Sequence, residues 1–177
     1  MTLLALTAIG EDRPGILAAV TEPLARLGCN IEDSSSSILR GHFAVMLVLA
    51  APDGVTAAQV SAALAPAAEK LGLVVTARPL REAPHVPAAP THLVSVYGAD
   101  HPGIAAGVTG LLAERGVNVA ELTTRLLGTP AAPVYVMLLE LVLPSTLPAD
   151  ALEADLRRLA AELRVELAMR PLESDAL

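Results

Sequence analysis

The sequence has few of the residues that several classes of protein require. Its 177 residues include one cysteine, Cys29, and no tryptophan. A single cysteine can form neither an intrachain disulfide nor a C-x-x-C metal site, and the four histidines are not spaced as metal ligands. The only aromatic residues are Phe43, Tyr97 and Tyr135, so stacking of bases or sugars has little support. We therefore expect no disulfide framework, no metal site and no cofactor.

Long apolar runs and clustered basic residues are also missing. No run reaches the roughly 18–20 residues of a membrane-spanning helix, and the apolar start of the chain soon meets acids and a proline. Twelve basic residues are scattered among 19 acidic ones, and the formal net charge is −7. This balance argues against direct docking on nucleic acid. We expect a cytoplasmic protein with no membrane segment and no direct nucleic-acid contact.

The sequence does contain an internal repeat. "GEDRPGI" at 10–16 returns as "GADHPGI" at 98–104, and shifting the chain by 88 positions aligns 10–30 with 98–118. Twelve of these 21 positions are identical. Such a match indicates that one module has been duplicated.

The order of elements can be predicted for each copy. Apolar runs of strand length and apolar residues at helical spacing alternate along both halves. The expected strands are 3–9, 30–39, 43–49 and 74–78 in the first copy, and 93–97, 118–127, 134–142 and 165–170 in the second. One helix should follow each Asp-X-Pro-Gly turn and end at Gly28 or Gly116, and the others should cover 56–71 and 149–163.

This order predicts an α+β fold of two ferredoxin-like βαββαβ modules. We expect one module at 1–80, a proline-rich linker at 81–90, "REAPHVPAAP", and a second module at 91–177. Each four-stranded sheet would leave one face and both edges uncovered. We therefore expect the two modules to pack as a pseudo-twofold intrachain pair.

The repeated turn is also the strongest candidate for a binding site. The residues Asp12, Pro14 and Gly15 would open a helix, with the aspartate near the cap and the proline in the first turn. Unpaired N–H groups and the helix dipole attract anions at such a start, and Arg13 adds positive charge. The same residues also make an ordinary strand-to-helix turn, and an asparagine after a glycine, as at Asn30, is an ordinary turn residue.

The repeated pattern G-x-D-x-P-G-I…G-x-N, at 10–31 and again at 98–119, resembles the signature of the ACT domain. The whole chain is similar to the double-ACT family of the glycine cleavage system transcriptional repressor. The resemblance implies that an amino acid binds where the turn of one module meets the second strand of its partner. It nominates Asp12, Arg13, Pro14, Gly15, Ile16, Asn30 and Ile31, and, in the second copy, Asp100, His101, Pro102, Gly103, Ile104, Asn118 and Val119.

We therefore expect a non-enzymatic amino-acid sensor. The resemblance implies that it acts on transcription through a protein partner. The alternative is an allosteric regulatory subunit that docks on an amino-acid metabolic enzyme, and a homodimer is a further assembly to consider. A small enzyme would need an acid–base or nucleophile set, which is not apparent, and an RNA-binding module would need stacking aromatics.

Two smaller features complete the prediction. The polar run "EDSSSSIL" and its counterpart "AELTTRL" suit edge strands whose hydroxyl groups bond across strands or line an interface pocket. Cys29 is expected to be a small buried residue in a turn, with a thiol sensor as the alternative.

Overall fold

The structure is a computed structural model that describes residues 1–80, 89–129 and 131–172. The chain divides into two compact units, Met1–His85 and Val86–Leu177, which are called module 1 and module 2 below. Most of the predicted linker, 81–88, lies outside the described residues. The predicted boundaries of the two modules, at residues 80 and 91, therefore remain a prediction.

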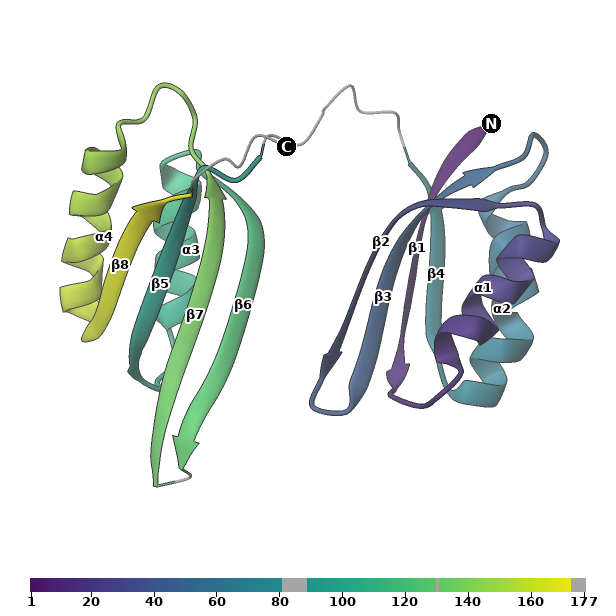
Figure 1. The fold of residues 1–177 in the computed structure, drawn as a ribbon, viewed down its shortest axis with the longest axis horizontal. Coiled ribbons are helices and arrows are strands. Elements are labelled where there is room, and N and C mark those ends of the chain that lie inside the picture. Colours follow the sequence, from purple (N-terminus) through teal and green to yellow (C-terminus); the bar gives the residue numbers. More distant parts are fainter. Residues whose placement is uncertain (81–88, 130, 173–177) are drawn as a thin grey trace. The chain divides into compact units, whose positions relative to one another are not determined.

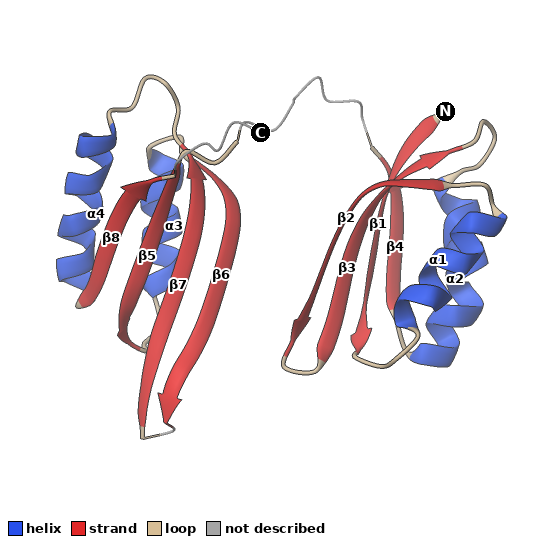
Figure 2. Cartoon of the chain, in the orientation of Figure 1, coloured by secondary structure: helices blue, strands red, loops and turns tan. Residues whose placement is uncertain are grey.

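Module 1 is an antiparallel sheet with two helices on one face (Figures 1 and 2). The strand order is β2-β3-β1-β4. The elements are β1 Thr2–Glu11, α1 Ile16–Arg26, β2 Asn30–Leu39, β3 His42–Ala51, α2 Ala57–Leu71 and β4 Val74–Pro79.

Module 2 has the same topology, with strand order β6-β7-β5-β8. Its elements are β5 His92–Ala99, α3 Ile104–Glu114, β6 Asn118–Thr129, β7 Ala132–Val142, α4 Ala149–Leu163 and β8 Val165–Pro171. The predicted βαββαβ order is confirmed in both modules.

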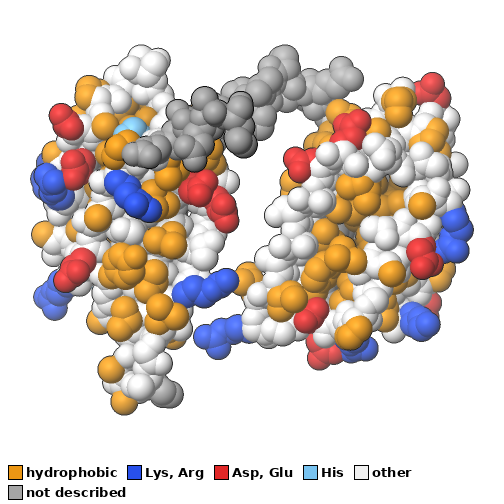
Figure 3. All heavy atoms as spheres, viewed as in Figure 1, with side chains coloured by type: hydrophobic (Ala, Val, Ile, Leu, Met, Phe, Trp, Pro, Cys, Tyr) orange, Lys and Arg blue, Asp and Glu red, His pale blue; other side chains and the backbone are white. Residues whose placement is uncertain are grey.

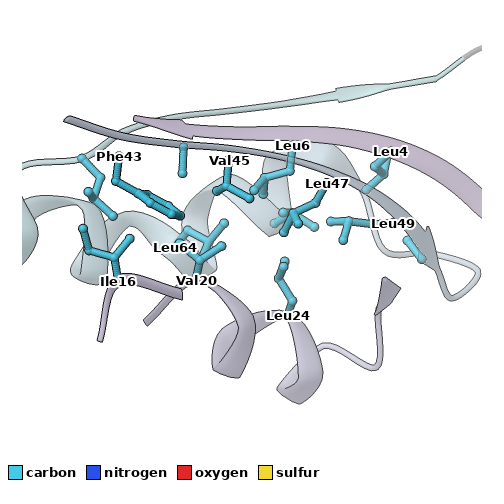
Figure 4. Packing of buried hydrophobic residues seen from close by; sticks show 14 residues of the cluster. Leu4, Leu6, Ile16, Val20, Leu24, Phe43, Val45, Leu47, Leu49 and Leu64 are labelled. Carbon is cyan, nitrogen blue, oxygen red and sulfur yellow. The ribbon is translucent and has the colours of Figure 1, made fainter. Parts of the chain in front are cut away.

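Each module has its own hydrophobic core between sheet and helices. In module 1, alternate residues of β1 and β3 point toward the helices, so that Leu6 and Leu47 pack with Val20 and Leu24 of α1 (Figure 4). In module 2, the equivalent cluster includes Val108 and Leu112. The apolar residues at helical spacing in the repeat therefore form the faces of α1 and α3 that cover the sheets.

The glycines that follow α1 and α3 end these helices as predicted. Gly28 and Gly116 have φ values of 74° and 67°, in the left-handed region that favours glycine. The next residue in module 1, Cys29, donates its N–H to the Leu24 carbonyl at 3.0 Å, and Gly28 donates to Ala25 at 2.9 Å. These two bonds form a Schellman motif, which satisfies the last carbonyls of the helix.

The prediction that the aspartates cap the helix starts is wrong. The N-cap residues are Gly15 and Gly103, with φ values of 91° and 105°, and neither helix start has a side-chain capping bond. Asp12 precedes Gly15 by three residues, so it lies outside the capping position. Pro14 likewise precedes the helix instead of lying in its first turn.

The polar strands β2 and β6 lie at sheet edges, as expected. All ten residues of β2 are exposed, because neither helix covers this strand. Hydrophobic side chains also reach the surface of both modules (Figure 3), among them Ile38 and Met46 in module 1 and Leu122 and Leu126 in module 2. Such edges and apolar residues are available for contacts with another module or protein.

Candidate functional site

The turn in module 1 runs from the end of β1 to the start of α1. Arg13 forms an ion pair with Glu11, and the hydrogen bond and charge of Arg13 lower the pKa of the Glu11 carboxyl. The Asp12 backbone N–H donates to the Gly41 carbonyl at 2.8 Å, which fixes the turn against the β2–β3 hairpin. The Asp12 carboxylate is exposed and has no hydrogen-bond or ion-pair partner among the described residues. The positive charge that Arg13 was expected to offer an anion is thus largely balanced by Glu11.

The start of α1 leaves backbone donors available. The N–H groups of Gly15, Leu17 and Ala18 have no acceptor within the described part of the chain. A Cβ built on Gly15 would meet no atom within 4 Å, so the space beside this backbone is open. The positive φ of Gly15 is sufficient reason for a glycine at this position. The free amides can in addition hold a carboxylate.

The turn in module 2 is held differently, through His101. The His101 Nε2 lies 2.8 Å from the carbonyl oxygen of Leu163, the last residue of α4, and Nδ1 lies 3.1 Å from the Pro102 carbonyl. Both acceptors are carbonyl oxygens, so only the doubly protonated ring donates to both. These two backbone bonds raise the pKa of His101 above its ordinary value of 6.5.

We expect module 2 to become less stable as the pH rises. The folded module holds the His101 proton more tightly than the unfolded chain, so the stabilisation is complete below pH 6.5 and is lost as the pH passes the higher folded pKa. Urea unfolding followed by tyrosine fluorescence measures this, because both tyrosines, Tyr97 and Tyr135, lie in module 2. His101→Ala should flatten the pH dependence across this range. A wild-type midpoint that does not fall above pH 6.5, or one that falls equally in the variant, would contradict this role of His101.

The first glycine of each motif has a packing role. A Cβ on Gly10 would lie 2.5 Å from Leu73 Cδ2, and one on Gly98 would lie 2.7 Å from Val165 Cγ1. Both glycines are in strands, where the chain after α2 or α4 passes close by. These positions are therefore explained without a ligand.

The two asparagines of the predicted site lie far from the turn of their own module. Asn30 lies at the end of the sheet where β1 starts, because Asn30 and Leu3 both pair with Ala50 of β3. Asp12 lies at the opposite end, directly after Glu11, the last residue of β1. Eight residues of strand separate these levels, which is about 26 Å at about 3.3 Å per residue. In module 2, Asn118 lies beyond the level of His92 and the turn follows Ala99, so the separation is similar. One module alone cannot bring its turn and its asparagine to one ligand.

Asn30 and Asn118 are nevertheless suitable for binding. Both are exposed, and neither side-chain amide has a hydrogen-bond partner among the residues that the structure describes. An unoccupied amide can both donate and accept, which suits the ammonium and carboxylate of an amino acid.

The apolar members of the predicted site differ in exposure. Ile16 and Ile104 are 2% and 1% exposed and belong to the cores, so their side chains are already packed. Ile31 is 38% exposed, and Val119 is half-buried at the edge of module 2. Ile31 and Val119 can contact a ligand through side chains, whereas Ile16 and Ile104 can offer backbone only.

Sequence reasoning missed a β-bulge next to each asparagine. The register shifts between Ile31 and Asp33 in β2, and between Val119 and Glu121 in β6. Bulges bend a strand and redirect side chains, and they are common beside functional sites. The repeated polar strands gave no signal for them, because a bulge depends on the register with the neighbouring strand.

The hydroxyl groups of these strands do not bond across the sheet. Ser35, Ser36, Thr123 and Thr124 form no side-chain hydrogen bond in the structure, and their partners across the strand pairs are apolar, as with Ser35 and Met46. The expectation of cross-strand hydroxyl bonds is therefore wrong. The hydroxyls are free to face another surface.

The described residues give no support to a reactive thiol, a metal site or a membrane-spanning helix. Cys29 is half-buried against the core of module 1, and burial raises the pKa of its thiol, which keeps it protonated and poorly nucleophilic. Within the described ranges, no cluster of three His, Cys, Asp or Glu side chains is arranged to hold a metal ion. None of the helices described has the length and apolarity to cross a membrane.

Comparison with known proteins finds related sequences for both modules. Sequence models of the ACT domain match residues 2–78 and residues 92–161. The glycine cleavage system transcriptional repressor of Escherichia coli strain K12 is 32% identical over 165 residues, which cover 93% of this chain and 85% of the repressor. A UPF0237 protein of Methanopyrus kandleri is 43% identical over 76 residues, 42% of this chain and 84% of that protein.

Solved structures show the same fold. A protein from Galdieria sulphuraria has a TM-score of 0.81 at 24% identity, covering 97% of this chain and 99% of that one. The matched spans coincide with modules 1 and 2, and the repressor matches across both. The chain therefore contains two ACT domains in tandem and belongs to the family of the glycine cleavage system transcriptional repressor.

Proposed function

We propose that this protein is a non-enzymatic amino-acid sensor that modulates transcription of amino-acid metabolism, glycine metabolism included, through a protein partner. The coarser part of this statement, an amino-acid-responsive regulator, follows from the tandem ACT domains and the repressor relative. The indirect route is supported by the net charge of −7, which opposes direct binding to DNA.

The binding site that we propose takes its parts from two modules. The turn at Asp12–Gly15 supplies backbone N–H groups, and the asparagine at the start of the second strand of another module supplies its amide. The single observation that carries this proposal is the separation of turn and asparagine within each module. A ligand that needs both must lie where two modules meet.

Strand direction supports the pairing. In each module the turn lies at the end of the sheet where the second strand finishes, because Leu39 and Glu11 both pair with His42. If β2 paired in antiparallel fashion with the second strand of another module, the turn of each module would lie beside the asparagine of the module paired with it. That module could belong to this chain or to another copy.

Binding at such a junction would change how the modules associate, and a partner would respond to the change. A ligand shifts an equilibrium only by its differential affinity for the two states, with coupling energies typically about 1–3 kcal/mol. The two turns differ at Arg13/His101 and Glu11/Ala99, so we infer two sites of unequal affinity.

A thermal-shift screen of the full chain against the twenty amino acids tests the proposal. We expect at least one amino acid to raise the unfolding midpoint in a saturable manner, because it binds only the folded protein. Asn30→Ala and Asn118→Ala should each reduce the rise without lowering the ligand-free midpoint, since both amides are exposed and unpartnered. Thr76→Ala, at an exposed position of the opposite edge strand β4, is the control. Indifference to all twenty amino acids, or full response in both asparagine variants, would refute the proposed site.

A further inference from the structure

Helices α1 and α2 of module 1 lie side by side on one face of their sheet (Figure 1). Residues of both helices line a groove between them. Its volume is about 470 Å³. The walls include Ala19 and Pro23 of α1 and Ala63, Pro66 and Ala67 of α2. This volume is within the range of pockets that accommodate ligands or several side chains of a partner.

Module 2 narrows the equivalent space with its own residues. Helices α2 and α4 both have 15 residues, so Ala67 corresponds to Leu159. In α3, a Cβ on Gly107 would lie 3.2 Å from Leu163 Cδ1 and 3.6 Å from Leu159 Cδ1, so both leucines lie beside α3. Leu163 has an equivalent in Leu71, which lines the groove of module 1, so Leu159 is the leucine that differs. The Ala67 side chain of module 1 is shorter than that of Leu159, and the groove of module 1 is correspondingly wider.

An ion-pair cluster further closes the helix pair of module 2. Asp155 is 9% exposed and forms ion pairs with Arg115 and Arg158. These residues line a smaller hollow of about 290 Å³. At the position of Asp155 module 1 has Ala63, which carries no charge to pair. The groove of module 1 is thus wider and lined by fewer charged residues than the equivalent hollow of module 2.

At two matching positions on the rims the charges of the two modules are opposite in sign. Module 1 has Arg26 and Lys70 where module 2 has Glu114 and Glu162. Among the described residues, no carboxylate lies within 4.0 Å of the Lys70 ammonium. On a chain with net charge −7, this local excess of positive charge favours an acidic partner.

Glu22 balances Arg26 only weakly. The Arg26 guanidinium is 4.0 Å from the Glu22 carboxylate, and the two side chains are 73% and 68% exposed. An exposed pair at this distance contributes little, so the arginine can exchange it for an incoming carboxylate.

Prolines lie on both walls of the groove. Pro23 and Pro66 are inside α1 and α2, where a proline removes a helical N–H donor. The carbonyl of Ala19, which also lines the groove, therefore lacks its usual helical donor at position 23. The two prolines also add apolar surface to the walls of the groove.

We propose that this groove is the docking surface for a partner protein that inserts an amphipathic helix. Its apolar side chains would enter between α1 and α2, and its acidic side chains would meet Arg26 and Lys70. Pro14 and Gly15 form one end of the groove, so an amino acid bound at the turn would alter the docking surface directly. The inference rests on the proposed function only in requiring a protein partner.

Site-specific photo-crosslinking in cells tests this inference. A photoreactive residue replaces Glu22 on the rim, and the matched control replaces Gly110, the equivalent position of module 2, where a Cβ would meet nothing within 4 Å. We expect an adduct from position 22 whose crosslinked segment, identified by mass spectrometry, is an amphipathic helix with acidic residues. No adduct should form at position 110. A crosslink to a second copy of this chain, to a basic segment, or to no protein would overturn the inference.

Binding of the identified segment, as a synthetic peptide, then measures the roles of shape and charge. Ala67→Leu fills the groove as module 2 does, and Arg26→Glu with Lys70→Glu reverses its rim. Each should weaken binding at least tenfold, whereas Glu114→Lys, on module 2, should not. Unchanged binding in Ala67→Leu would overturn the inference even with an adduct.

The thermal response to amino acids separates this result from the proposed function. If Ala67→Leu abolishes peptide binding but keeps the amino-acid response, the groove docks the partner and the turn binds the ligand. If the wild type has no amino-acid response but the peptide still binds, sensing fails and docking stands.

Discussion

Leu24→Ala is expected to lower the unfolding free energy of module 1 by about 2–5 kcal/mol, as is typical for a leucine removed from a close-packed core. Leu24 is 1% exposed and packs among Leu6, Leu47 and Val20. The surrounding residues close only part of the space that the lost side chain leaves, so a cavity cost adds to the lost apolar contacts. A loss of this size would remove much of the stability of so small a domain.

The two modules can be followed separately in the same sample. Tyrosine fluorescence reports module 2 alone, since both tyrosines lie there, and far-ultraviolet circular dichroism reports both modules. Leu24→Ala should therefore move the dichroism transition and leave the tyrosine transition nearly in place. The matched variant Leu112→Ala, at the equivalent repeat position, should move the tyrosine transition. Equal shifts of the tyrosine transition in both variants would show that the cores are not separate.

Gly98→Ala is expected to destabilise module 2 by about 1–3 kcal/mol, the usual range for overpacking. The added Cβ would lie 2.7 Å from Val165 Cγ1, 3.2 Å from its Cβ and 3.3 Å from its Cα. Valine is stiff and the Cα is backbone, so β8 must move away from β5 to make room. The tyrosine transition in urea measures the loss.

Gly10→Ala is the matched variant in module 1. The nearest atom there is Leu73 Cδ2, the end of a flexible side chain, so Gly10→Ala should cost less than Gly98→Ala. If Gly98→Ala is as stable as the wild type, the glycine is not explained by packing, and a role at the ligand site becomes the better account.

The fold could be predicted from the sequence because each helix and strand occurs twice, so that its pattern in one copy could be compared with its pattern in the other. The first helix of each module begins with the same turn, and the glycines at 28 and 116 mark its end. Errors in one copy would have shown as disagreement with the other. The predicted cap at the helix start was nevertheless wrong. An aspartate two residues before a proline is typical of a capping residue, and the sequence does not indicate that Gly15 has a positive φ and is itself the N-cap.

The candidate site could be predicted only in part. The residue types of the turn and of the asparagine were apparent in the sequence. The separation of about 26 Å between them could be found only from the pairing of the strands in the structure. The groove of module 1 was missed for another reason. The equivalence of Ala67 and Leu159 follows an offset of 92, not the 88 of the repeated turn. Strands β6 and β7 have 12 and 11 residues where β2 and β3 have ten each, and the connection from β7 to α4 is one residue longer than that from β3 to α2. The contrast between the two helix pairs therefore appears only after the helices are superposed by their ends.

Amide hydrogen exchange, with and without the stabilising amino acid, tests the central claim most directly. The account predicts slower exchange in two places at once: one turn, at 12–16 or 100–104, and one strand start, at 30–32 or 118–120. Both segments of a pair must respond, because turn and asparagine of one module are too far apart to share a ligand. Protection confined to a turn alone or a strand start alone, or absent from all four segments, would contradict a site built from two modules.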